Sequence, residues 1–251
     1  MADTIVRLLQ LAKDLLRLCE NHMPIKKGQR LTKEQCCALI LYRTIHELAS
    51  DSVLMISNGR SISSPVLLRS LFEYHVEMLY LIDDPKRFEQ RILDACREGQ
   101  KCLNKIAESK HRSFSDIKND PRLEDARSKL ATILKEHEET KFWGICNKLG
   151  LDTKYNTVYR LLSAYAHPSM NISLNTHIAR EDENGVLQYN PNAELYEDKA
   201  ILYINLVKQI LIDATEQIHR FIPDDIISAV KKELDKFCSL WDNSMPSANS
   251  K

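Results

Sequence analysis

This chain of 251 residues is poor in glycine, has no net charge and contains no long apolar run. It has six glycines, whereas average usage of about 7% would give roughly seventeen. Few glycines mean few tight turns, which argues against an all-β sandwich and against a sheet with glycine-rich phosphate loops. The 35 basic and 35 acidic residues balance, so any binding to nucleic acid or anionic lipid must depend on a local patch.

Clustered cysteines and targeting segments are also missing. The seven cysteines are scattered and form no C-x-x-C pair, so they indicate neither a zinc site nor a secreted disulfide scaffold. The longest apolar stretch, residues 36–42, is far shorter than a membrane span. The first residues lack the cationic and apolar regions of a signal peptide. We therefore expect a cytoplasmic protein with no metal, no cofactor and no membrane contact.

What the chain does have is helical periodicity, divided into segments by its eight prolines. Thr32 and Gln35 form a capping-box pattern, and Ser64 and Pro65 match an N-cap followed by a first-turn proline. The apolar spacing predicts helices over about 4–21, 32–58, 64–83, 85–109, 120–139, 141–149, 152–167, 193–221 and 223–241.

These segments predict an all-α fold, a single bundle of about eight to nine helices. Since no repeat and no Ser/Gly linker interrupts it, we expect one domain over residues 1–242 and a disordered tail over 243–251. The helices that begin at Thr32 and Pro65 are expected to be central. The long segment 169–191 is the main irregular feature, and its Asn-Gly pair favours a small hairpin.

The segment from Tyr159 to Ser169 carries the most informative pattern. Arg160 and His167 are seven positions apart, which at about 100° per residue places them within about 20° of the same helix face. Ser163 lies between them on that stripe. RNA cleavage without a metal requires an imidazole that transfers protons and a guanidinium that stabilises negative charge on the phosphate.

This segment resembles the HEPN superfamily of helical proteins, whose ribonuclease members carry an arginine, four to six further residues and then a histidine. The resemblance implies that His167 is the acid/base and Arg160 the phosphate ligand, at an interface between two protomers. Cleavage would proceed by attack of the 2′-hydroxyl on the adjacent phosphate. Leu161 departs from the pattern, because the ribonucleases usually have Asn, Asp or His there.

A second polar stripe lies on the very apolar helix predicted over 64–83. Arg69, Glu73 and Glu77 follow an i, i+4 spacing, and on a central helix they are candidates for partial burial. A buried charge must be paired. We expect Glu73 to contact Arg69, or to orient Arg160 or His167 from across the bundle. Removal of one partner of a buried pair should cost roughly 3–5 kcal/mol.

The two segments together resemble a bacterial helical family of unknown function. Its members show R-x-x-x-E followed by Asp-Pro, and later Y-R-x-x-S-x-x-x-H-P-S. The resemblance covers about residues 64–169 and names no activity. The matching positions are Arg69, Glu73, Asp84, Pro85, Tyr159, Arg160, Ser163, His167, Pro168 and Ser169.

The leading interpretation is therefore a HEPN-like, metal-independent endoribonuclease, a toxin or phage-defence effector that acts on RNA as a homodimer and has a neutralising or sensing protein partner. Its candidate catalytic residues are Arg160, His167, Ser163, Glu73 and Arg69. The alternative is a non-catalytic helical module that senses or binds a partner, in which His167 caps its helix and Arg160 pairs with a carboxylate.

A di-iron centre is a third interpretation, which the sequence disfavours. Glu108-x-x-His111 and Glu216-x-x-His219 have the spacing used by di-iron carboxylate bundles. However, His111 lies between Lys110 and Arg112, at a charged helix end where a ligand from the bundle core is not expected.

Overall fold

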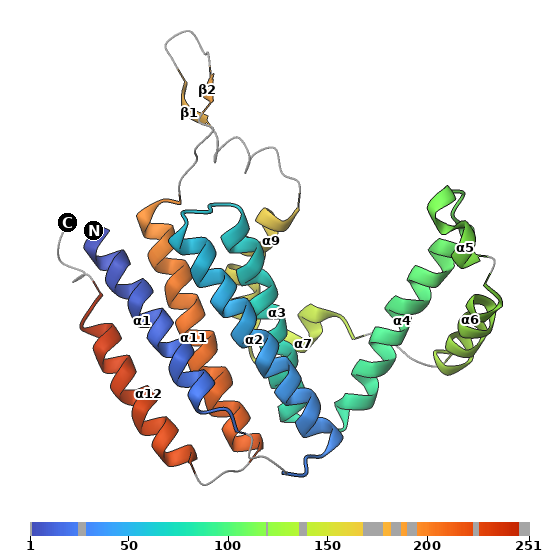
Figure 1. Ribbon diagram of the computed structural model, residues 1–251, viewed down its shortest axis with the longest axis horizontal. Helices are drawn as coiled ribbons and strands as arrows, with labels where there is room; N and C mark the ends of the chain where they lie inside the picture. Colours follow the sequence, from blue (N-terminus) through green and yellow to red (C-terminus); the bar gives the residue numbers. More distant parts are fainter. Residues whose placement is uncertain are drawn as a thin grey trace.

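The computed structural model describes residues 2–24, 29–118, 120–135, 140–167, 178–181, 187–189, 195–222 and 226–245. Helices α1, α2, α3, α11 and α12 lie side by side, and α7 to α9 cover one side of α3 (Figure 1). The helices are α1 Ala2–Asn21, α2 Lys33–Ser57, α3 Ser63–Asp83, α4 Arg87–Glu108, α5 Ser115–Lys118, α6 Pro121–Ile133, α7 Phe142–Lys148, α8 Asp152–Lys154, α9 Arg160–Ala166, α11 Glu197–Phe221 and α12 Ile227–Asp242. A short 3₁₀ turn, η1, spans Arg112–Phe114, and a π-helical turn, η2, spans Tyr155–Tyr159.

The predicted all-α fold is confirmed, and the ends of α2 are those that the sequence indicates. The Thr32 hydroxyl accepts a hydrogen bond from the Gln35 N–H at 3.2 Å, and the Gln35 side chain accepts one from the Thr32 N–H at 3.1 Å. Gly59 follows the helix with φ 66°, a left-handed conformation that glycine adopts without strain.

The core lies where α2, α3 and α11 meet, as expected for α2 and α3. The sequence interpretation did not single out α11, which also packs against α1 and α12 and is equally central. Tyr42 and Thr215, both buried, join α2 to α11 through a 2.9 Å hydrogen bond between their hydroxyls. This buried polar pair is satisfied internally, as a low-dielectric core requires.

The structure corrects the predictions for the start of α3 and for the segment 152–167. Helix α3 begins at Ser63, and Ser64 donates its hydroxyl to the Arg60 carbonyl at 2.6 Å, so Ser64 is not the N-cap. The segment 152–167 is not one continuous α-helix, because η2 separates α8 from α9. The wider turn of η2 lets Tyr155 and Tyr159 stack, with ring centroids 5.0 Å apart.

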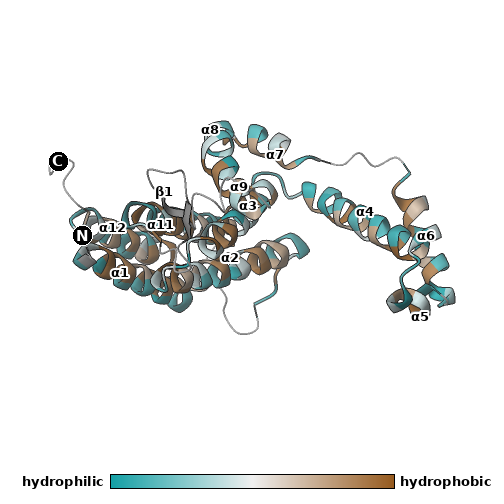
Figure 2. Ribbon diagram, turned by 90° about the horizontal axis from the view of Figure 1, so that it is seen from above, coloured by the Kyte–Doolittle hydropathy of each residue, from teal (hydrophilic) through white to brown (hydrophobic). Residues whose placement is uncertain are grey.

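Helices α4 to α6 form an arm, residues 87–135, that stands apart from the bundle in both ribbon views (Figures 1 and 2). Helix α6 packs on α4 and begins where the sequence predicts, with Asp120 as its N-cap, because the Asp120 carboxylate accepts from the Arg122 N–H at 2.9 Å. The helix ends at Ile133 rather than near residue 139, and residues 136–139 lie outside the described part.

The predicted hairpin is present beyond the end of the bundle, as strands β1 Ile178–Glu181 and β2 Leu187–Tyr189. They pair antiparallel, with Ile178 opposite Tyr189, while the Asn-Gly turn lies outside the described residues. Of the tail predicted over residues 243–251, residues 246–251 also lie outside them, whereas Ser244 is buried and Met245 packs against the core, so these two residues belong to the fold. Among the helices that the structure describes, none is long and apolar enough to cross a membrane. All seven cysteines are free thiols.

Candidate functional site

The two sequence motifs meet in space through three side chains. Arg69 Nε donates to Glu73 Oε1 at 3.0 Å, as the i, i+4 spacing on α3 predicts. Tyr159, at the end of η2, donates its hydroxyl to the same carboxylate oxygen at 3.0 Å. Arg69 Nη2 donates to that hydroxyl at 3.2 Å and its guanidinium lies over the tyrosine ring, 5.3 Å from the centroid. Glu73 therefore pairs with Arg69, and Tyr159 connects this pair to the chain segment that carries Arg160.

Aromatic packing fixes the position of Tyr159. Its ring lies 4.9 Å from that of Phe142 and 6.1 Å from that of Phe72, measured between centroids. Burial and the neighbouring Glu73 carboxylate raise the pKa of Tyr159 above its ordinary value. The phenol is therefore protonated at neutral pH and remains a hydrogen-bond donor to Glu73.

Arg160 and His167 lie on the solvent side of α9. Both are exposed, while Leu162 on the opposite side is buried in the core. The His167 N–H still donates to the Ser163 carbonyl at 3.3 Å, but His167 has extended backbone, φ −103° and ψ 140°. This is the conformation favoured for a residue that precedes proline. Within the described part of the chain, neither side chain has a hydrogen bond or an ion pair.

Ser163 is not grouped with Arg160 and His167. Its hydroxyl oxygen is buried and has no hydrogen-bond partner among the described residues. The structure thus brings Arg69 and Glu73 together with Tyr159, and leaves Arg160 and His167 open to solvent. The sequence interpretation did not include Tyr159 among the site residues, although its position directly before Arg160 in the motif was a signal for it.

A cleft of about 1030 Å³ opens beside this cluster, between α2, α3, α4 and the start of α7. Arg69, Glu73 and Glu77 line its α3 wall. Arg91 on α4 donates hydrogen bonds to both Glu77 and Asp94, and its Nε lies 2.8 Å from Glu77 Oε2. Burial raises the pKa of Glu77, although Arg91 acts in the opposite direction.

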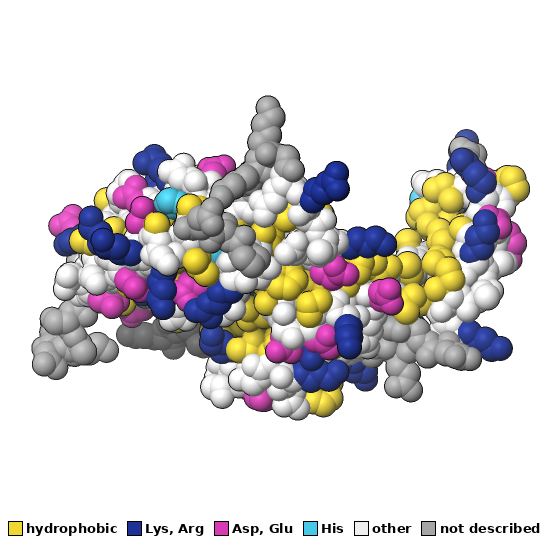
Figure 3. Space-filling model, turned by 90° about the horizontal axis from the view of Figure 1, so that it is seen from below, with side chains coloured by type: hydrophobic (Ala, Val, Ile, Leu, Met, Phe, Trp, Pro, Cys, Tyr) yellow, Lys and Arg dark blue, Asp and Glu magenta, His cyan; other side chains and the backbone are white. Residues whose placement is uncertain are grey.

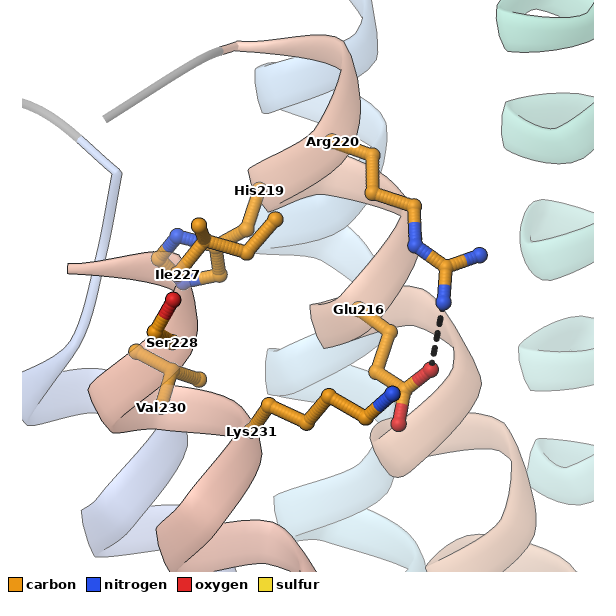
Figure 4. Close-up of a pocket in the computed structure, with 7 residues that line it drawn as sticks. All are labelled: Glu216, His219, Arg220, Ile227, Ser228, Val230 and Lys231. Atoms are coloured by element: carbon orange, nitrogen blue, oxygen red, sulfur yellow. Dashed lines mark hydrogen bonds and ion pairs between the residues drawn. The ribbon is translucent and has the colours of Figure 1, made fainter. Parts of the chain in front are cut away.

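A second hollow, of about 260 Å³, lies between the end of α11 and the start of α12 (Figure 4). It contains the second half of the di-iron pattern, but Glu216 is ion-paired with Arg220 at 3.1 Å while His219 points toward Ser228. Across the residues that the structure describes, no group of three or more His, Cys, Asp or Glu side chains is arranged to hold a metal ion.

Comparison with known proteins assigns the chain to a protein family through its sequence. The model of a family of unknown function, DUF5677, matches residues 35–186. No curated protein and no solved structure matches the chain. The matched segment includes both motifs and every residue that lines the 1030 Å³ cleft.

Proposed function

The chain belongs to DUF5677, a family of unknown function, and we propose that it is a HEPN-like, metal-independent endoribonuclease that acts in the cytoplasm as a toxin or phage-defence effector. The observation that carries the proposal is the solvent side of α9. Arg160 and His167 are both exposed there and have no partner among the described side chains. A structural pair would be buried and hydrogen-bonded instead.

In this reaction the RNA supplies its own nucleophile. His167 accepts the proton of a 2′-hydroxyl, whose oxygen attacks the adjacent phosphorus, and the bond to the 5′-oxygen breaks. A protonated imidazole, from the second protomer of the proposed homodimer, returns a proton to that oxygen. The products end in a 2′,3′-cyclic phosphate and a 5′-hydroxyl, and Arg160 stabilises the charge that develops on the phosphate oxygens.

We assign a positioning role to Arg69, Glu73 and Tyr159, the three side chains that join the two motifs. Arg69 and Glu73 line the cleft between α2, α3 and α4 rather than the exposed side of α9. They hold Tyr159, which immediately precedes Arg160 and thereby fixes the start of α9 against α3. Ser163, with its buried hydroxyl, is assigned to helix packing rather than to the chemistry.

The test is cleavage of total RNA by purified protein. We expect His167→Ala to lower the rate by about 10²–10⁴-fold and Arg160→Ala to lower it by a comparable factor, because each variant removes one transition-state interaction. Two exposed residues of the same types, His111 and Arg17, provide matched alanine controls that retain full activity. Chelators should have no effect. Equal cleavage by all variants, or none by the wild type, would refute the nuclease proposal.

The cleft supports a second candidate function, that of a non-catalytic module that binds a partner or ligand. Its volume of about 1030 Å³ is at the upper end of ligand pockets, and Arg69 and Glu73 lie in its wall. Native mass spectrometry of the purified chain tests this function. A co-purified ligand that is lost in Arg69→Ala would favour it, whereas its retention in that variant would exclude the cleft as its site.

A further inference from the structure

Helix α4 carries an apolar seam whose middle, residues 92–102, nothing in the described part of the chain covers, while Phe88 at one end of it packs against the core of the bundle. The members of the seam are spaced alternately four and three residues apart, the a/d spacing of a helix that packs along a second helix. Ile92 is 46% exposed, and Ala95, Gly99 and Cys102 are also exposed. The seam consists of Phe88, Ile92, Ala95, Gly99, Cys102 and Ile106.

The contacts of α4 with α6 lie on its other side, while Arg91 near its start reaches Glu77 of α3. Arg97 Nη2 donates to the Leu134 carbonyl at 3.2 Å, and Asn104 accepts from Arg127 Nε at 2.9 Å, so this is the side that faces α6. Figure 3 shows apolar side chains gathered along the arm and at its junction with the bundle. Because apolar surface of this kind is stabilised by removal from water, the open seam indicates a partner helix.

Gly99 has no explanation within the monomer. It lies in the middle of α4, where glycine weakens a helix relative to alanine. A Cβ atom built at this position would meet nothing within 4 Å, so the fold of one chain does not require glycine. A glycine at the centre of an exposed seam is explained if another backbone approaches closely there.

The seam is also symmetric about Gly99 in side-chain size. Ile92 and Ile106 lie seven positions on either side, and the smaller Ala95 and Cys102 lie four and three positions away. Two identical helices that cross antiparallel at Gly99 would place the large side chain of one beside the large side chain of the other. Such reciprocity is what a two-fold interface between identical chains requires.

The charges beside the seam fit the same arrangement. Glu98 and Lys101, 63% and 54% exposed, form an ion pair within one chain at 2.6 Å. In an antiparallel pair centred near Gly99, Glu98 of one copy lies at nearly the same level along the helix axis as Lys101 of the other copy. The opposite charges at the edge of the seam therefore attract each other across the interface. The chain has no net charge, so no overall repulsion opposes self-association.

We propose that the exposed seam of α4 is a homodimer interface, in which α4 of a second copy packs antiparallel across Gly99. This contact is separate from the contact at α9 between protomers that the nuclease proposal uses. It does not depend on that proposal, because neither Arg160 nor His167 takes part.

Mass measurement over a dilution series tests the interface without RNA. The wild type should have the mass of two chains and dissociate on dilution. Gly99→Gln and Ile92→Asp should each raise the dissociation constant about tenfold or more. Ile133→Asp changes another exposed isoleucine of the arm, 56% exposed and outside the seam, and should behave as the wild type. A wild type that is monomeric at every concentration, or a dimer unaffected by both seam variants, would overturn the proposal.

Disulfide trapping tests the register. Within one helix, residues 95 and 102 are about 10 Å apart and cannot be bridged. Ala95→Cys should therefore form a covalent dimer with the native Cys102 of the other copy under mild oxidation, well above the wild-type background. Adding Cys102→Ser should remove that dimer. If the double variant cross-links as well as the single one, residue 95 faces its own counterpart, and the antiparallel arrangement is wrong.

Discussion

The bundle and the arm are both helical but are held together in different ways. In the bundle, α2, α3 and α11 contribute to one cluster of buried apolar side chains, which also includes residues of α1, α7, α9 and α12. The arm contributes no buried residue to that cluster. Of its described side chains, Asp94, Leu123 and Leu134 are buried. Because most of the stability of a helix in a protein comes from tertiary packing, we expect the helices of the arm to be less stable than those of the bundle, although their lengths are similar.

Where the arm meets the bundle, polar contacts join the two beside Phe88, a half-buried residue of α4 that packs against the core. Arg91 joins α4 to Glu77 of α3. Arg87 donates to the Tyr80 carbonyl at 3.2 Å, and its guanidinium lies 4.2 Å from the centroid of the tyrosine ring. These contacts are directional, so each depends on a single side chain, whereas burial in the bundle is shared among many.

The largest effect is expected from a cavity in the bundle. Leu68 on α3 is fully buried, so Leu68→Ala should lower the free energy of unfolding by about 2–5 kcal/mol. Ile133→Ala removes an exposed side chain from the arm and should stay within about 0.5 kcal/mol of the wild type. Chemical denaturation measures both changes. Equal losses would mean that the arm is as well packed as the bundle.

The next effect is local to the arm. Arg91→Met leaves Glu77 and Asp94, whose side chains are 24% and 8% exposed, without their cation. We expect a cost of about 2–3 kcal/mol, concentrated where α4 meets α3. Hydrogen exchange should show faster exchange in α4 and unchanged protection in α2 and α11. Unchanged exchange in α4 would show that Arg91 does not anchor the arm.

A smaller effect is expected at the motif cluster. The sequence alone suggested roughly 3–5 kcal/mol for a buried pair, but the Arg69 and Glu73 side chains are 22% and 34% exposed. Glu73→Gln should therefore cost only about 1 kcal/mol, a fall in Tm of about 2–4 °C. Glu47→Gln alters the same i, i+4 pair with Arg43 on the surface and should lower Tm less. If Tm falls no further in Glu73→Gln than in Glu47→Gln, the pair of Glu73 with Arg69 contributes no more stability than an ordinary surface ion pair.

The smallest effect is a pH dependence within the bundle. The hydrogen bond from His75 lowers the pKa of Asp213 below its ordinary value of 3.8. The folded state therefore favours the Asp213 carboxylate. The stability that this contributes is present above pH 3.8 and is lost as pH falls from there through the lowered pKa of the folded state. Thermal unfolding between about pH 5 and pH 3 should show a shallower loss for Asp213→Asn than for the wild type. Parallel curves would show that Asp213 does not contribute to acid sensitivity.

Local features of the fold could be predicted from the sequence. The capping box at Thr32, the cap at Asp120 and the pairing of Arg69 with Glu73 each depend on residues no more than four positions apart. Helix periodicity and short-range hydrogen bonds determine such features without reference to the rest of the chain. For the same reason the helices were predicted well, apart from the η2 turn and the ends of some segments.

The sequence by itself thus determined the helices, the capping box of α2 and the presence of two polar motifs, because neighbouring residues encode them. Only the tertiary structure decided that Tyr159 joins the motifs, since it contacts Arg69 across 90 positions of the chain. It also decided that the Ser163 hydroxyl is buried, that His167 is exposed, and that α4 leaves the bundle with its apolar seam uncovered. Burial and long-range contact depend on how whole helices pack, and periodicity shows which face of a helix is apolar but not what covers it.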